Sequence, residues 1–491
     1  MIPNKYLDNL LVDEKATLKK IINVVNENAL GACFITTNNK FKAVVTDGDI
    51  RKLILQKYSL NKNISKFLKY KKSFTLSYLC SNINILKKLS KNIKIIPLID
   101  KKTKKIIDYA TINKVKKISI YDQRFGGNEL EYVSNCLKTG WVSSVGNYVS
   151  SFEKKFSTTF KNKFSLTVSS GTTGLQLALK AIGIKEGDEV IVPNLTFAAT
   201  ANSVIHVGAI PVFADIDKNS YNICPESIKL KITSKTKAII CVHLYGQPCE
   251  MKQIKKIAKK NKLYLVEDCA EALGSKYNKK FISSFGDVSV FSFFGNKTLT
   301  TGEGGMLVTS KKNIFLKAKS LRDHGMDPIK RYWHNEVGFN FRMTNMQAAI
   351  GLAQLENIDK IINKKIKIAK IYEKEIKKIN KNIDNKIILP YRLEGCYNTF
   401  WLYNIRIKNF SETDRDKLIL SLQEVGVECR SFFYPMSRMK IYEKYFKKFE
   451  KFPNSNDVHQ NGICLPSSPY LKYDEIAYIV SELQKKLIKF L

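Results

Sequence analysis

A single lysine, Lys297, lies at a glycine-marked corner between two apolar runs. The run before it, Val288–Phe294, predicts a strand, and a second strand is expected to begin at Gly304 and Gly305. Most lysines of this chain are expected on its surface, so the corner alone gives Lys297 no special role. A carboxylate and an anion site that precede it in the sequence change that interpretation.

The carboxylate belongs to Asp268, which follows the apolar run Leu263–Val266. Ligands of open α/β sheets bind beyond the carboxyl ends of the strands, which is where this aspartate is expected. The anion site is predicted upstream, where the strand Phe164–Ser170 leads into Gly171 and Thr172 and then into an apolar helix. A small-residue turn at a helix N-terminus leaves backbone N–H groups free to bind a phosphate.

A phosphate site, a strand-end aspartate and a lysine are the three groups that pyridoxal 5'-phosphate requires. The lysine amine forms a Schiff base with the aldehyde of the cofactor. The aspartate keeps the pyridine nitrogen protonated, so that the ring can accept electrons. We therefore predict a pyridoxal-phosphate enzyme in which Lys297 and Asp268 are the catalytic residues.

Several separated motifs of the chain resemble the DegT/StrS family of sugar aminotransferases, over about residues 120 to 491. The motifs are GWVSSVGNYVSSFE, SSGTTGLQLAL, VPNLTFAATANSV, VEDCAEALGSKY, SFGDVSVFSFFGNKTLTTGEGGM and VGFNFRMTNMQAAIGLAQLE. The resemblance implies an α/β fold of the aspartate-aminotransferase type, with a mostly parallel central sheet and a small C-terminal α/β subdomain. It also implies a substrate that is a nucleotide-linked keto-sugar.

The resemblance assigns cofactor contacts to further residues. Ser170 joins Gly171 and Thr172 in the phosphate turn, and Ser292 matches a serine that binds the same phosphate. Without the motif, Ser292 would be an ordinary residue on one face of a strand.

Three more residues match cofactor contacts of the family. Phe197 matches an aromatic residue that stacks on the pyridine ring, although a phenylalanine after a strand is otherwise expected in the core. Glu271 matches a residue that contacts the cofactor hydroxyl. Asn340 matches an asparagine that reaches the cofactor phosphate of the partner subunit, which implies a homodimer or a higher oligomer with shared active sites.

The runs SFFGNKT and YWHNEVGFNFRMTN are most similar to family members that aminate GDP-4-keto-6-deoxymannose. The expected reaction transfers the amino group of glutamate to a nucleotide-linked 4-keto-6-deoxy-sugar, here giving GDP-perosamine for surface polysaccharide synthesis. Lys297 would also move the proton between the donor α-carbon and the cofactor. A UDP-linked 2-acetamido-4-keto-sugar is the alternative acceptor, because nothing in the sequence reads guanine directly.

Residues 1–116 are expected to form a separate α+β module. Two strands, Gly31–Thr37 and Phe41–Thr46, are separated by an Asn-Asn turn signal, and a helix follows. This part resembles the first half of a CBS pair, a regulatory module that often binds adenine nucleotides. The resemblance makes Thr46 and Asp49 candidate ribose ligands, whereas the plainer interpretation is an aspartate that caps the helix.

The second half of this module is expected to contain the strands Ile95–Asp100 and Ile106–Ala110, but it lacks the T-x-x-D pattern. A scaffold or an oligomer contact is therefore the rival role for the module. A non-catalytic, nucleotide-sensing scaffold is the alternative for the whole chain. Such a scaffold would be expected to lose Lys297 or Asp268, and family dehydratases replace the lysine by histidine. The predicted boundaries are a linker at 117–119, a large cofactor-binding domain at 120–370 and a small C-terminal subdomain at 371–491.

The net charge of +38 raises the question of nucleic-acid binding. Only ten of the 82 basic residues are arginine, the residue most used to read bases, and the lysines are spread along the whole chain. We therefore predict no nucleic-acid partner. Part of the charge is expected to attract an anionic sugar nucleotide.

Other classes of function find little support in the sequence. The ten cysteines form no C-x-x-C pairs and the five histidines lack metal-ligand spacing, so neither a disulfide framework nor a metal site is expected. The segment MIPNKYLDNLLVDEK has acidic residues where a signal peptide would be apolar, and no run is long enough to cross a bilayer. A cytoplasmic protein without a membrane partner is expected.

Overall fold

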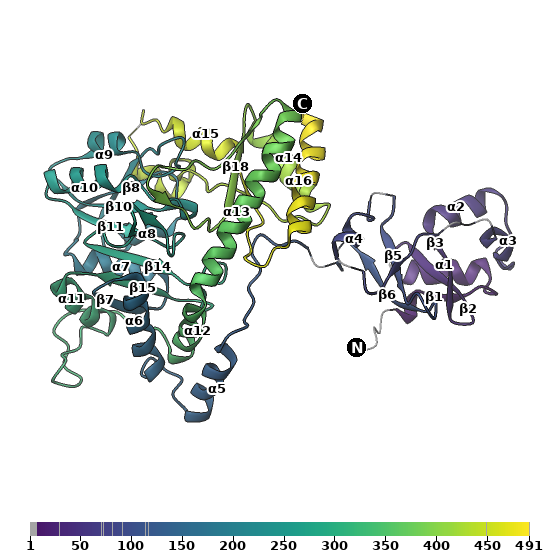
Figure 1. The fold of residues 1–491 in the computed structure, drawn as a ribbon, viewed down its shortest axis with the longest axis horizontal. Coiled ribbons are helices and arrows are strands. Elements are labelled where there is room, and N and C mark those ends of the chain that lie inside the picture. The colour runs from purple at the N-terminus through teal and green to yellow at the C-terminus, as the bar shows by residue number, and fades with distance from the viewer. Residues whose placement is uncertain are drawn as a thin grey trace. The chain divides into compact units, whose positions relative to one another are not determined.

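The structure is a computed structural model that describes residues 7–490, except residues 29, 70, 72, 81, 91, 113, 116 and 448. The chain divides into two compact units. One comprises the residues up to Ile118 together with Ser421–Val427, and the other comprises Ser119–Leu420 and Glu428–Leu491. Figure 1 shows the elements of each unit, with the N-terminal unit in purple and dark blue.

The N-terminal unit begins with a three-stranded sheet. Strand β1 (Leu11–Asp13) lies parallel to β2 (Ala32–Thr37), which lies antiparallel to β3 (Lys40–Thr46). Helix α1 (Leu18–Glu27) connects β1 to β2, and α2 (Asp47–Leu55) follows β3. The two predicted strands are thus present, and the Asn-Asn turn between them has positive φ angles of 50° and 60°.

The same β-α-β-β order then occurs a second time. Strand β4 (Leu76–Ser77) lies parallel to β5 (Ile95–Ile99), which lies antiparallel to β6 (Ile106–Thr111). Helix α4 (Asn82–Leu86) connects β4 to β5, and the short helix α3 (Ser65–Leu68) precedes β4. The unit therefore contains two copies of one topology, each with its own sheet.

The larger unit is built on a seven-stranded sheet, of which only β15 runs antiparallel to its neighbours. In spatial order the strands are β7 (Phe164–Val168), β15 (Gly305–Thr309), β14 (Val288–Ser292), β11 (Tyr264–Asp268), β10 (Thr236–Val242), β8 (Glu189–Pro193) and β9 (Ile210–Ala214). The helices of this unit up to the C-terminal part are α5 (Glu129–Thr139), α6 (Asn147–Phe160), α7 (Gly171–Ala181), α8 (Ala199–His206), α9 (Pro225–Lys231), α10 (Met251–Lys260), α11 (Lys312–Arg322) and α12 (Asn345–Glu356).

Both faces of the central sheet are buried. On β14, Val290 packs in the cluster that contains Leu175 of α7, whereas the next residue, Phe291, packs in the cluster that contains Phe156 of α6. Successive side chains of a strand point to opposite faces, so a strand covered on both sides must be apolar at nearly every position. This explains the continuous apolar runs in the sequence.

The C-terminal part begins with the long helix α13 (Ile358–Asn380), whose apolar stripe is buried and whose lysines are mostly exposed. An antiparallel sheet follows, formed in spatial order by β16 (Ile387–Ile388), β18 (Tyr403–Ile407), β20 (Gly462–Leu465) and β19 (Arg430–Ser431). The remaining elements are the helices α14 (Glu412–Gln423), α15 (Pro453–Asn461) and α16 (Tyr473–Leu487) and a small sheet of β13 (Lys280–Phe281), β12 (Lys276–Tyr277) and β17 (Cys396–Tyr397). None of the helices in the described part of the chain combines the length and the apolar character that a bilayer crossing needs.

Candidate active site

A cavity of about 410 Å³ lies beyond the carboxyl ends of the central strands. It receives side chains from the segments that follow β7, β8, β11 and β14, because parallel strands end at the same edge of the sheet. Its lining includes all of the residues predicted to hold a cofactor except Asn340. These are Ser170, Gly171, Thr172, Phe197, Asp268, Glu271, Ser292 and Lys297.

The predicted phosphate turn forms the first turn of α7. Ser170 is the N-cap, and its Oγ accepts a hydrogen bond from the Thr173 N–H at 3.1 Å while its own N–H donates to Thr173 Oγ1 at 3.0 Å. The N–H groups of Gly171 and Thr172 have no partner within the helix, since they belong to its first turn. They are therefore free to bind an anion at the positive end of the helix dipole.

Gly171 also explains how Ser292 reaches this turn. A Cβ atom at position 171 would lie 2.9 Å from the Cβ of Ser292, so only glycine lets the end of β14 approach the helix this closely. The Ser292 hydroxyl thereby stands beside the free N–H groups. A phosphate fits this arrangement of donors.

Asp268 is the last residue of β11 and is only 5% exposed. Its Oδ2 accepts a hydrogen bond from Thr200 Oγ1 at 2.9 Å, and its Oδ1 accepts one from the Ala270 N–H at 3.1 Å. Burial raises the pKa of this carboxyl, and its hydrogen bonds offset the rise only in part. A cation bound in the cavity would favour the ionised form, which is what a protonated pyridine nitrogen provides.

Lys297 projects into the same cavity with a side chain that is 13% exposed. Its Nζ donates to Glu271 Oε1 at 3.4 Å and lies 3.8 Å from the centre of the Trp401 ring. Glu271 is buried, and its Oε2 accepts the Tyr245 N–H at 2.9 Å. Burial raises the pKa of Glu271, and the charge of Lys297 acts in the opposite direction.

Phe197 is 59% exposed and lies in the lining of the cavity. Its ring touches only one other aromatic ring among the described residues, that of Phe433, at a centroid distance of 5.9 Å. An apolar ring that is left open toward a cavity is suited to stacking on a flat ligand.

Sequence reasoning missed three residues of the site. Thr200 holds Asp268 and lies three positions after Phe197, so its place in the motif VPNLTFAATANSV, which was already noted, is the signal that could have indicated it. Trp401 and Arg430 also line the cavity, but they come from the C-terminal part of the chain. No local pattern in the sequence marks either of them.

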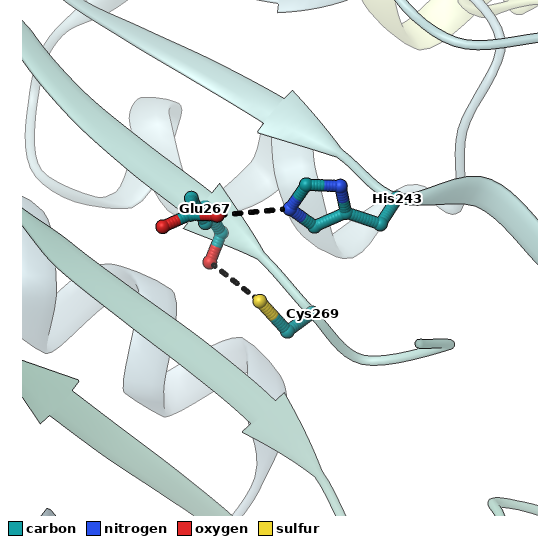
Figure 2. Close-up of side chains that lie close together, drawn as sticks. All are labelled: His243, Glu267 and Cys269. Atoms are coloured by element: carbon teal, nitrogen blue, oxygen red, sulfur yellow. Dashed lines mark hydrogen bonds and ion pairs between the residues drawn. The ribbon is translucent and has the colours of Figure 1, made fainter. Parts of the chain in front are cut away.

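A buried cluster supports the strand end that carries Asp268. Figure 2 shows His243, Glu267 and Cys269, with the His243 ring directed at the Glu267 carboxylate. His243 Nε2 lies 3.1 Å from Glu267 Oε2, and the three ligand atoms of the cluster lie within 4.8 Å of one another. The backbone N–H of His243 donates to the backbone carbonyl of Asp268 at 3.1 Å, which connects the cluster to the site.

The Glu267 carboxylate is already saturated with hydrogen bonds. Besides His243, it accepts from the N–H groups of Ser283, Phe285 and Gly286 and from the Ser289 hydroxyl. Burial by itself would raise the pKa of Glu267, but the bond and charge of His243 and these backbone donors hold it below its usual value. The cluster is thus a hydrogen-bonded support, with no carboxylate oxygen left open toward a metal ion.

Asn340 is exposed and does not line the cavity of its own chain. Its Oδ1 accepts a hydrogen bond from Arg342 Nε at 3.1 Å. The backbone of Asn340 forms an isolated antiparallel β-bridge with that of Asp323. The structure therefore does not bring Asn340 to the other predicted cofactor residues.

In the N-terminal unit, Thr46 and Asp49 bond to each other. Thr46 is the N-cap of α2, so the helix is capped by the threonine and not by an aspartate. Asp49 accepts from the Thr46 N–H at 2.9 Å and the Thr46 hydroxyl at 2.8 Å, and it forms an ion pair with Lys71. A cleft of about 420 Å³ is lined by Thr46, Gly48, Arg51 and Lys71, among others, but not by Asp49.

Together, the largely parallel sheet, the free helix N-terminus, the buried aspartate and the lysine in one cavity define a pyridoxal-phosphate enzyme of the aminotransferase class. The comparisons with known proteins identify the family. The chain belongs to the DegT/DnrJ/EryC1/StrS aminotransferase family, whose model matches residues 123–484.

Relatives match nearly their whole length on this part of the chain. The GDP-perosamine synthase of Escherichia coli O157:H7 is 44% identical over 371 residues, which cover 76% of this chain and 99% of the relative. The X-ray structure of an aminotransferase from Psychrobacter cryohalolentis superposes with a TM-score of 0.70 at 30% identity, covering 75% of this chain and 99% of that one. The PLP form of a putative sugar aminotransferase from Streptococcus pneumoniae has a TM-score of 0.70 at 25% identity, covering 76% and 100%. This protein is accordingly a PLP-dependent sugar aminotransferase.

Proposed function

We propose that this aminotransferase transfers the amino group of glutamate to a GDP-linked 4-keto-6-deoxymannose and so produces GDP-perosamine. The observation that carries the proposal is the 44% identity with the Escherichia coli GDP-perosamine synthase along 99% of that enzyme. The choice of glutamate as donor rests on the resemblance of the sequence motifs to the family.

Lys297 is proposed to hold the cofactor and to move the proton that leaves the donor α-carbon. Two cationic side chains, Lys297 and Arg430, occur among the described residues that line the cavity. Of these two, the charge that acts on the buried carboxyls of Asp268 and Glu271 is that of Lys297. Pyridoxal phosphate, when bound, supplies the electron sink that lets the donor α-carbon lose its proton. Glu271 holds the Lys297 amine in place and Trp401 covers it.

The geometry of the cavity supports the remaining proposed cofactor contacts. Gly171 and Thr172 offer backbone N–H groups to the phosphate, and Ser292 offers its hydroxyl. Asp268, held by Thr200, is placed to keep a pyridine nitrogen protonated. Phe197 offers its open face for stacking on the ring.

Arg430 is proposed to bind the anionic part of the substrates. It lines the cofactor cavity and also a neighbouring cavity of about 480 Å³, with which the first one shares Thr196, Phe197 and Phe433. Its side chain is 49% exposed and pairs with Glu428 at 3.2 Å. Glutamate carries carboxylates and a sugar nucleotide carries a diphosphate, and a guanidinium recognises both groups through paired hydrogen bonds.

A homodimer or higher oligomer is proposed from the position of Asn340. This residue is exposed, and the segment 340–345 is bordered by loops with exposed apolar side chains. Asn345 contacts the loop 141–145 through Ser143 O at 2.6 Å and Trp141 O at 2.7 Å, and the loop 326–337 adjoins Asn340 along the chain. The exposed side chains are Trp141, Val142, Val145, Ile329, Tyr332, Trp333 and Val337. Exposed apolar groups of this kind mark protein contacts.

The unit up to Ile118 is proposed to be a CBS pair that binds an adenine nucleotide. Its two copies of the β-α-β-β topology support the pair. Its cleft carries the positive side chains of Arg51, Lys71 and Lys94 beside the N-terminal turn of α2, which suits a phosphate. The ribose contact is then assigned to Thr46, because Thr46 lines the cleft and Asp49 does not.

The experiment that tests the proposed reaction is a coupled assay of the purified protein with glutamate against a panel of GDP- and UDP-linked 4-keto-sugars. We expect turnover with GDP-4-keto-6-deoxymannose, formation of 2-oxoglutarate and ping-pong kinetics. Preference for a UDP-linked 2-acetamido-4-keto-sugar would replace the proposed acceptor by the alternative. Turnover of no keto-sugar by a protein that binds the cofactor would favour a non-catalytic scaffold.

A further inference from the structure

Lys365 of α13 is a buried lysine that pairs with no acidic side chain in the described part of the chain. The whole residue is 2% exposed, and its Nζ donates to two backbone carbonyls, those of Trp401 at 3.1 Å and Ser467 at 2.8 Å. The ring of Tyr121 lies 4.8 Å from the same nitrogen. Burial lowers the pKa of Lys365 to about 7, since no charged group offsets it.

A lysine is a costly residue for such a place. A methionine or leucine would fill the space without taking an amine out of water. The lysine does, however, satisfy two carbonyls that would otherwise be buried without a donor. Even a neutral amine has two N–H groups, so both hydrogen bonds persist when Lys365 loses its proton.

The first of these carbonyls belongs to the residue that covers the catalytic lysine. The face of the Trp401 ring lies 3.8 Å from Lys297 Nζ, and the indole N–H donates to the carbonyl of Asn296 at 2.8 Å. Trp401 is 4% exposed, so it excludes water from one side of the amine. The negative face of an indole also favours a positive charge on the nitrogen beside it.

The second carbonyl belongs to Ser467, a residue that also holds the strand that follows Trp401. The Ser467 Oγ accepts the Tyr403 N–H at 2.7 Å, and the Ser467 N–H donates to the carbonyl of Ile120 at 2.8 Å. Lys365 therefore ties Trp401, just before β18, to Ser467, just after β20, and Ser467 in turn bonds to β18 and to Ile120. The position of Trp401 depends on that junction.

We propose that Lys365 is a positioning residue that holds Trp401 over the amine of Lys297. Trp401 in turn keeps water from that amine and favours the protonated form of the cofactor bound there. This inference rests on the proposed role of Lys297 in holding the cofactor.

The experiment measures the absorbance of the enzyme-bound cofactor against pH in four variants. Trp401→Leu removes the indole. We expect the titration midpoint of the cofactor absorbance to fall by about one pH unit in this variant, which is a tenfold change in the protonation equilibrium. Lys365→Met is expected to move the midpoint in the same direction, and Lys365→Arg is expected to restore it in part, since arginine can donate to both carbonyls. Lys364→Met, at an exposed neighbour on the same helix, removes one lysine charge and is expected to leave the midpoint unchanged.

The double variant of Trp401→Leu and Lys365→Met decides whether the two residues act together. If Lys365 acts through Trp401, the second substitution adds no further change to the midpoint. A midpoint that Lys365→Met leaves at its original value, in a protein with native circular dichroism, overturns the inference, and so does full additivity in the double variant. Failure of the proposed function is seen separately: the cofactor absorbance would then be the same in Lys297→Ala as in the parent enzyme.

Discussion

The amine of Lys297 lies 3.4 Å from the carboxylate of Glu271, inside a cavity where burial raises the pKa of that carboxyl. The charge of Lys297 offsets part of the effect of burial on the pKa of Glu271. The Tyr245 N–H holds the second oxygen of Glu271 at 2.9 Å, so the carboxylate cannot turn away. The Lys297 amine is thus held in position by its neighbours before any cofactor binds.

Glu271→Gln is expected to lower the turnover about tenfold, because the amide keeps the shape but loses the negative charge that holds the Lys297 amine in place. The titration midpoint of the bound cofactor should fall in the same variant.

Lys297→Ala is expected to lower turnover by 10²–10⁴-fold or more, roughly the contribution of general acid–base catalysis. Borohydride reduction followed by peptide mapping checks the site, and a label on any other lysine contradicts the assignment.

Thr200→Val tests the support of Asp268. The substitution removes one hydrogen bond to a buried carboxylate, which is worth about 1.5–3 kcal/mol, and so should lower turnover roughly 10- to 100-fold. Asp268→Asn should cost more, since the pyridine nitrogen then loses its anionic partner. Steady-state kinetics with saturating cofactor measures both. An Asp268→Asn enzyme with parental turnover would show that the aspartate does not serve the ring.

Hybrid dimers test the position of Asn340. Lys297→Ala and Asn340→Ala chains are each expected to be inactive or weak, because one lacks the amine and the other lacks a phosphate contact. Random assortment of an equal mixture makes about half of the dimers hybrids with one intact site each, so the mixture should regain about a quarter of the parental activity. Activity after subunit exchange, verified by mass spectrometry, is the measurement. An exchanged mixture without recovery would place both residues in the site of one subunit.

Removal of residues 1–116 is expected to leave a folded and active aminotransferase. Every residue that lines the cofactor cavity lies beyond residue 119, and the Escherichia coli relative is matched over 99% of its length by only 76% of this chain. Any effect of a nucleotide on the rate should disappear with the deletion. Calorimetry of the full chain with AMP, ATP and the GDP-sugar product checks binding, and unchanged nucleotide regulation in the truncated enzyme would refute the regulatory role.

Asp49→Ala is the point variant that accompanies this deletion. It removes the return bond of the α2 capping box, so it should cost about 1 kcal/mol of stability as well as weaken nucleotide binding. Thr46→Ala, which removes the other partner of the same capping box, is the matched variant. Because Thr46 lines the cleft and Asp49 does not, Thr46→Ala is expected to weaken binding more.

Stability against pH reports on Lys365. Its pKa of about 7 in the folded protein is below its unfolded value of about 10.4, so the unfolded chain binds more protons between these two values. The free energy of unfolding contributed by this residue therefore rises by about 1.4 kcal/mol per pH unit from pH 7 to pH 10, and is smallest below pH 7. Denaturant unfolding of the parent and of Lys365→Met is measured at pH 7, 8 and 9. The free energy of unfolding of the parent should rise relative to that of the variant as the pH rises. A constant difference would mean that Lys365 has the same pKa in the folded and the unfolded chain and stays protonated over this pH range.

The sequence by itself determined the ends of the central strands and therefore the neighbourhood of Lys297, Asp268 and Gly171. Strands buried on both faces, such as the one with Val290 and Phe291, need apolar runs, and such runs are visible without a structure. Parallel strands then bring their carboxyl ends to one edge, so short motifs far apart in the chain could be assigned to one cavity. The resemblance of these motifs to the family supplied the rest of the predicted set.

Only the tertiary structure decided what surrounds those residues. Trp401 and Lys365 enter through the packing of the C-terminal part, and a buried amine between two carbonyls leaves no periodic or local pattern in a sequence. The same holds for Thr46 and Asp49: the sequence shows two polar groups at a helix start, but whether they face a ligand or each other depends on side-chain geometry. Strand and helix signals are short-range and survive in the sequence, whereas the partner of a polar atom is fixed by long-range packing.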